Sequence, residues 1–99
     1  MNYKFSIYQL KESARDKMFL DLDFLARKNA KPDINDYEEV FSGTIEGDSD
    51  ISTLEDLFYI FNLDHPKGYD GHSLSVSDVV KLNDDALWYC DSFGWKKIA

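Results

Sequence analysis

The sequence predicts an α+β fold in which two helices cover one face of a mainly antiparallel sheet. Three observations support this class. The chain has 99 residues, which is enough for one hydrophobic core. Apolar and polar residues alternate near both ends, as in half-buried strands, and two internal segments carry apolar residues at helical spacing. We therefore expect residues 1–99 to form a single domain with the element order β-α-β-α-β-β-β.

The first strand is predicted from YKFSIYQL, residues 3–10. Tyr3, Phe5 and Ile7 fall on one side of an extended chain, and the pattern then shifts phase to Tyr8 and Leu10. A phase shift inside a strand indicates a possible bulge.

The first helix is predicted to run from residue 13 to about residue 30. The motif SARD matches a capping box in which Ser13 accepts a hydrogen bond from the backbone. Met18, Leu22 and Leu25 recur at helical spacing, and Pro32 prevents the helix from continuing.

The second strand is predicted around residues 40–45, with Gly43 as a bulge candidate. The motif STLE then matches a second capping box, so we expect a helix from Ser52 to about Asn62. Its predicted core residues follow the i, i+3, i+4, i+7 pattern and are Leu54, Leu57, Phe58 and Phe61.

The C-terminal third predicts three short strands at residues 79–82, 86–92 and 95–99. The polar turn NDD separates the first two, and Gly94 precedes the third. An antiparallel meander is the simplest topology for these strands.

Acidic residues dominate the composition, with 19 acidic against 11 basic side chains and a net charge of -8. No Lys or Arg occurs from Pro32 to Pro66, where ten acidic residues fall. Such a charge distribution repels nucleic acid and attracts basic grooves. It also fits a solvated acidic face that only keeps the protein soluble. The candidate partner-binding residues are Asp33, Asp36, Glu38, Glu39, Glu46, Asp48 and Asp50.

The loop between residues 62 and 78 contains both histidines. His65, His72 and Asp78 are residues of uncertain role. The two histidines and an aspartate are compatible with a facial metal site, and His65 and His72 are compatible with the acid and base of a ribonuclease in which Lys67 stabilises charge. The histidine spacing matches no standard metal motif, and the charge leading into the loop is unfavourable for a phosphate substrate. The glycines and the proline favour a structured connector instead. We therefore expect no metal, no cofactor and no enzymatic activity.

Cys90 is the only cysteine, which excludes an intrachain disulfide and fits a reducing compartment. Its place on an alternating strand predicts a small buried residue rather than a nucleophile. The N-terminus lacks the pattern of a secretion signal, and no apolar run is long enough to span a membrane. These features predict a cytoplasmic protein.

Residues 54–98 resemble the YodL-like domain of accessory proteins from bacterial conjugative elements and related plasmids. The matching motifs are LEDLFYIFN, an HP pair shortly after it, GHSLSVSDVV and the closing WYCDSFGW, and YKFSIYQLK fits the usual start of the domain. The resemblance implies no catalytic residues. The setting of such domains among anti-defence genes implies interference with host immunity.

Small acidic proteins of this kind also resemble type II anti-CRISPR inhibitors in size, charge and setting. We therefore expect an anti-defence protein of a mobile genetic element, most concretely an inhibitor whose acidic surface occupies the basic nucleic-acid channel of a type II CRISPR nuclease. The alternatives are a non-catalytic protein-interaction module of a conjugative element and a small histidine-dependent ribonuclease.

Overall fold

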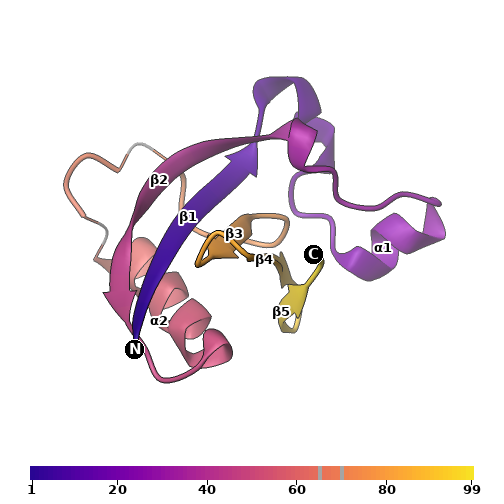
Figure 1. Cartoon of the computed structure of the whole chain (residues 1–99). Helices are drawn as coiled ribbons and strands as arrows, with labels where there is room; N and C mark the ends of the chain where they lie inside the picture. Colours follow the sequence, from indigo (N-terminus) through magenta and orange to yellow (C-terminus); the bar gives the residue numbers. More distant parts are fainter. Residues whose placement is uncertain (65, 70) are drawn as a thin grey trace.

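The structure is a computed structural model that describes residues 1–64, 66–69 and 71–99. In these residues, five strands form one antiparallel sheet in the order β2-β1-β3-β4-β5 (Figure 1). The strands are β1 (Asn2–Leu10), β2 (Tyr37–Glu46), β3 (Val79–Leu82), β4 (Ala86–Asp91) and β5 (Gly94–Lys97). The helices are α1 (Leu22–Arg27) and α2 (Asp50–Leu63), and two 3-10 segments are η1 (Glu12–Lys17) and η2 (Ile34–Asp36).

The α+β class and the predicted order of helices and strands are confirmed. The strands β3, β4 and β5 pair in sequence as a meander, and β3 covers the residues predicted for it. β1 lies between β2 and β3, so it joins the two halves of the sheet. This order leaves β2 and β5 as the two edge strands.

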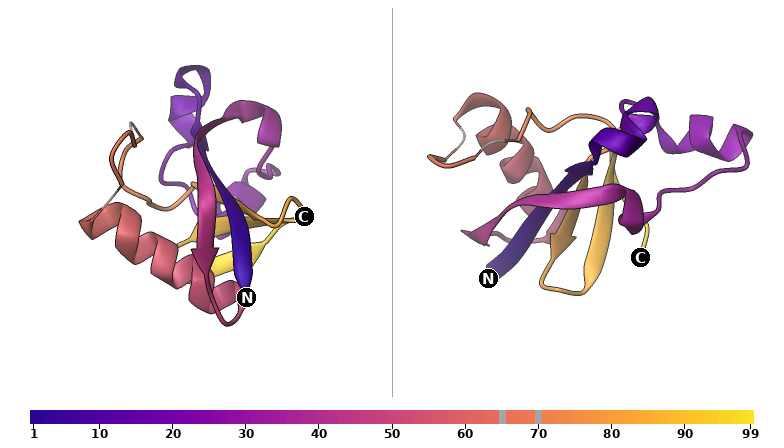
Figure 2. Two further views of the ribbon diagram at one scale, coloured as in Figure 1. Left: turned by 60° about the vertical axis from the view of Figure 1, so that its left-hand side comes forward. Right: turned by 90° about the horizontal axis from the view of Figure 1, so that it is seen from above.

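Apolar residues cover both faces of the sheet, because successive side chains of a strand point to opposite faces. On one face α2 packs Leu57 and Phe61 into a core that includes Val80 of β3. On the other face Leu25 of α1 joins a smaller cluster that includes Val79 of the same strand. The expectation that both helices cover one face is therefore wrong. The right-hand view of Figure 2 shows α1 and α2 at opposite ends of the molecule.

The single helix predicted over residues 13–30 is also wrong, because the chain forms η1 and α1 with a break between them. No side chain caps η1, so Ser13 does not have its predicted role. The break includes Phe19, whose φ is 66° and whose N–H donates to Ser77 Oγ at 3.1 Å. Asp21 then caps α1 by accepting the Phe24 N–H at 2.8 Å. The hydrogen bond from Phe19 to Ser77 and the new N-cap at Asp21 thus interrupt the helix that the spacing of apolar residues predicts.

Helix α2 begins earlier than predicted, because Ser49 and not Ser52 is its N-cap residue. Ser49 Oγ accepts the Ser52 N–H, and Ser52 Oγ accepts the Ser49 N–H, each at 3.2 Å. This reciprocal pair uses the Ser52 side chain three positions inside the cap, as in a capping box.

The predicted core stripe of α2 is confirmed in part. Leu54, Leu57 and Phe61 are fully buried, with exposed fractions of at most 1%. The prediction for Phe58 is wrong, since 39% of this residue is exposed. Phe58 lines an open groove beside β4 and β5, so the sheet does not cover it.

The β-bulge lies at the predicted phase shift of β1, but the extra residue belongs to β2. Ile7 pairs with Phe41 and Tyr8 pairs with Glu39, which leaves Val40 without a direct partner. β1 itself keeps strict alternation, and Tyr8 packs on the face opposite to Ile7. Gly43 pairs regularly, so it is not the bulge residue. A Cβ atom at Gly43 would lie only 3.2 Å from the ring of Phe5, so the close aromatic ring explains this glycine.

Candidate functional site

The predicted acidic residues lie along one edge of the sheet, in and beside the edge strand β2. Two precede the body of the strand, three are in it, and two follow it in the turn and at the start of α2. Ten extended residues span about 33 Å, so these carboxylates form a line and not a compact cluster. We call this line the acidic edge, and its members are Asp33, Asp36, Glu38, Glu39, Glu46, Asp48 and Asp50.

The bulge decides which face of the sheet each glutamate of β2 occupies. Glu39 lies opposite Tyr8, and Glu46 lies opposite Asn2, so these two glutamates share one face. Without the extra residue at Val40 their odd separation in sequence would place them on opposite faces. Glu38 pairs with Gln9 and lies on the other face. The acidic edge therefore presents carboxylates on both sides of β2.

Some members of the acidic edge are engaged within the protein. Asp36 Oδ2 lies 2.7 Å from Lys17 Nζ, and this hydrogen bond raises the pKa of the lysine. Asp33 Oδ1 accepts the Asn35 N–H at 3.0 Å, and Glu46 pairs with the N-terminal amine at 3.3 Å. These contacts hold the ends of β2 and partly neutralise its charge.

Glu38, Glu39 and Asp48 are exposed and have no ion pair among the described residues. Charged side chains on an edge strand protect its free N–H and C=O groups against pairing with another strand. The same charges are available to a basic partner. These exposed carboxylates therefore protect the free edge of β2 against pairing with another strand.

A second arrangement of polar groups joins β1 to the loop before β3. Gln9 is only 3% exposed and occupies the core position that follows Tyr3, Phe5 and Ile7 along the strand. Gln9 Oε1 accepts the His72 N–H at 3.2 Å, and Gln9 Nε2 lies 2.9 Å from the His72 carbonyl oxygen. This double contact fixes the loop backbone against the central part of the sheet.

Tyr69 and Asp78 complete this network. The Tyr69 hydroxyl donates to the His72 carbonyl oxygen at 2.5 Å and lies 3.1 Å from Gln9 Nε2. Asp78 is 1% exposed, and its Oδ2 atom accepts the Ser75 N–H at 3.0 Å. Burial raises the pKa of Asp78 to about 7, although the nearby His72 and the hydrogen bonds oppose that shift.

The imidazole of His72 has both nitrogens directed at protein atoms. Nδ1 lies 2.7 Å from the Ser73 carbonyl oxygen, to which it donates, and Nε2 lies 3.8 Å from Asp78 Oδ1. A general base needs an unused lone pair within reach of its substrate. Donation from Nδ1 leaves the lone pair on Nε2, which faces the carboxyl group of Asp78 at a distance too long for a hydrogen bond.

The predicted loop residues are brought together in part. His72 and Asp78 lie side by side, whereas His65 lies outside the described residues. Within residues 1–64, 66–69 and 71–99, no group of three His, Cys, Asp or Glu side chains is placed to hold a metal ion. Cys90 is buried as predicted, and burial raises the pKa of its thiol to about 12.

The sequence analysis missed Gln9 and Tyr69. In β1 every second residue is buried, and Gln9 is the polar residue that follows Tyr3, Phe5 and Ile7 in this series. A polar residue at a predicted core position is the one sequence signal for a buried polar network. Tyr69 lies in a turn-rich loop and gives no periodic signal, so only the structure reveals its contact with β1.

A family model, the YodL-like domain, matches residues 4–99. The chain belongs to the YodL-like domain family. The match begins at residue 4 in β1 and extends past β5, so the acidic edge and the loop network both lie within the YodL-like domain. No curated protein and no solved structure matches the chain. No helix in the described part of this YodL-like domain is long and apolar enough to cross a membrane.

Proposed function

We propose that this YodL-like domain is a non-catalytic anti-defence protein of a mobile genetic element that acts in the cytoplasm. In this proposal the acidic edge binds the basic nucleic-acid channel of a host nuclease, and a type II CRISPR nuclease is the most concrete target. The protein would block the channel by presenting carboxylates where the nuclease normally binds phosphates.

The observation that carries the proposal is the line of carboxylates along β2, an edge strand whose outer side pairs with no other strand of the described sheet; Glu38, Glu39, Glu46 and Asp48 are exposed. A rigid strand holds Glu38, Glu39 and Glu46 at fixed spacing, so few side chains need to be ordered on binding. The absence of Lys and Arg from Pro32 to Pro66 means that no cation of this segment competes with the partner.

The charge beside the loop favours a binding role over a ribonuclease. Asp78 lies 3.8 Å from His72 Nε2, so a phosphate bound at His72 would lie close to this carboxyl group. A phosphate also gains no stabilisation from the neighbouring acidic edge.

The proposal is tested by reversing charge on β2 alone. The triple variant Glu38→Lys, Glu39→Lys and Glu46→Lys changes the net charge from -8 to -2, since each reversal adds two units. All three side chains are exposed, so the variant should fold. In cells whose type II CRISPR nuclease cleaves an incoming plasmid, the native protein should restore plasmid uptake, and this variant should not.

The matched control is the triple variant Asp56→Lys, Asp64→Lys and Asp85→Lys, which makes the same change in net charge with exposed residues outside β2 and outside the acidic edge. We expect this control to inhibit as the native protein does. Equal inhibition by a folded β2 variant would contradict the proposal. Failure of the native protein against a panel of type II nucleases would exclude the named target.

A further inference from the structure

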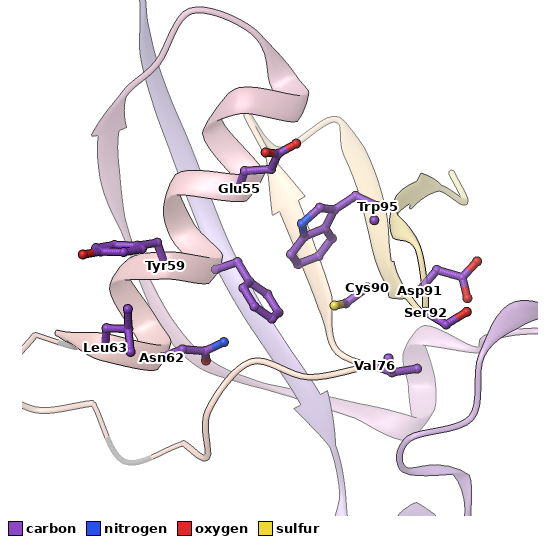
Figure 3. A pocket seen from close by; sticks show the side chains of 11 residues that line it. Glu55, Tyr59, Asn62, Leu63, Val76, Cys90, Asp91, Ser92 and Trp95 are labelled. Atoms are coloured by element: carbon purple, nitrogen blue, oxygen red, sulfur yellow. The ribbon is translucent and has the colours of Figure 1, made fainter.

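A groove of about 730 Å³ lies between the C-terminal half of α2 and the β4–β5 hairpin. Figure 3 shows Glu55 and Asn62 on the helix side of this groove and Cys90 and Trp95 on the strand side. Val76, from the loop before β3, lies at one end. The groove is at the β5 side of the sheet and is therefore separate from the acidic edge on β2.

The walls of the groove are mainly apolar, and several are open to solvent. Phe58 is 39% exposed, Tyr59 is 64% exposed and Leu63 is 70% exposed. Phe93, in the turn between β4 and β5, is 90% exposed and lies in sequence between the lining residues Ser92 and Gly94. Large apolar side chains gathered around one concave surface are typical of an interaction site.

The polar groups of the groove favour a basic partner. Glu55 and Asp91 are among the lining residues, and no Lys or Arg lines the groove. Helix α2 contains no Lys or Arg over its 14 residues. Asn62 donates from Nδ2 to the Leu74 carbonyl oxygen at 3.1 Å, while its buried Oδ1 has no hydrogen-bond partner among the described residues. Asp91 Oδ1 accepts the Leu22 N–H at 3.0 Å, which fixes the orientation of this carboxylate. The groove thus has two carboxylates and no cation beside its apolar walls.

The exposure of these walls indicates a peptide segment rather than a small molecule. A small-molecule site encloses most of the surface of its ligand. Tyr59 and Leu63 are too exposed to enclose a compact ligand, but they can contact a longer chain that crosses the groove.

We propose that the groove between α2 and the β4–β5 hairpin docks a segment of a partner protein in which apolar anchors are flanked by Lys or Arg. The anchors pack against Phe58, Leu63 and Trp95, and the basic side chains lie near Glu55 and Asp91. This site does not depend on the acidic edge or on its target.

The test is selection of random peptides displayed on phage against the purified native protein. Enriched peptides should carry aromatic or aliphatic residues next to Lys or Arg. On titration of a synthetic enriched peptide, the largest NMR shifts should be at the Trp95 indole and at Leu63. Phe58→Lys should weaken binding by about tenfold or more, because it removes an apolar wall of the groove and adds a charge that repels the basic segment.

Matched controls lie on the same fold. Phe24→Lys alters an aromatic residue of α1 with 40% exposure, close to that of Phe58, and should change the affinity by less than about twofold. Glu55→Lys should weaken binding, whereas Asp56→Lys, the next residue of α2 and not part of the lining, should not. The proposal is overturned if no peptide is enriched, if enriched peptides are acidic, or if they bind the Phe58→Lys protein as well as the native one.

Discussion

At the residue scale, Gln9 and Asp78 explain why the loop between α2 and β3 packs against the sheet. Gln9 gives an acceptor to the His72 N–H and a donor within reach of Asp78 Oδ2, 3.2 Å away. Asp78 in turn accepts the Ser75 N–H. These side chains form hydrogen bonds with backbone groups of the loop, which would otherwise lose their hydrogen bonds to water on burial. A buried carboxyl group makes the stability of this arrangement depend on pH.

The first prediction at this scale concerns the sign of that dependence. The pKa of Asp78 is raised from 3.8 to about 7, so the folded state binds this proton more tightly than the unfolded chain does. The contribution of Asp78 to stability is therefore fully present below about pH 4 and is lost as the pH rises toward about 7.

Asp78→Asn isolates this contribution, because its amide oxygen can still accept from Ser75. The free energy of unfolding of the native protein minus that of the variant should fall between about pH 4 and pH 7 and then level off. Urea denaturation across this pH range measures the difference. A difference that rises with pH would show that attraction to His72 outweighs the cost of burial.

At the element scale, the sequence predicts the kind of each helix and strand better than its ends. The strand β3 and the meander follow from alternation and turn residues alone. The break at Phe19 depends on a contact with Ser77, which is distant in sequence, so local pattern cannot reveal it. The predicted start of α2 is wrong because two serines can serve as its N-cap. Ser52 begins the SxxE motif that the prediction used, whereas Ser49 begins an SxxS motif and is the residue that caps the helix.

Helix α2 gives a prediction that separates its buried face from its open face. Leu57 has no exposed surface, so Leu57→Ala should lower the free energy of unfolding by about 2–5 kcal/mol. Phe58→Ala should cost about 1 kcal/mol, because Phe58 is already partly in water and leaves no closed cavity. Thermal and urea denaturation of both variants measure this. An equal loss in the two variants would mean that Phe58 is covered in solution.

At the scale of the whole molecule, the two candidate binding surfaces lie at opposite edges of one sheet. Composition alone reveals the acidic segment, since the charge gap from Pro32 to Pro66 is visible in the sequence. The distribution of its glutamates over two faces depends on the bulge at Val40, and the groove depends on how α2 leaves Phe58 uncovered. Both features arise from packing between distant segments, which periodicity does not encode.

The most direct test of the central claim is the salt dependence of binding to a purified type II CRISPR nuclease that the protein inhibits. If the acidic edge occupies the nucleic-acid channel, the Kd should rise steeply with salt, and single-stranded DNA should compete. The Glu38→Lys, Glu39→Lys, Glu46→Lys variant should bind weakly and with a smaller salt dependence. Tight binding by the native protein that neither salt nor DNA weakens would contradict the claim.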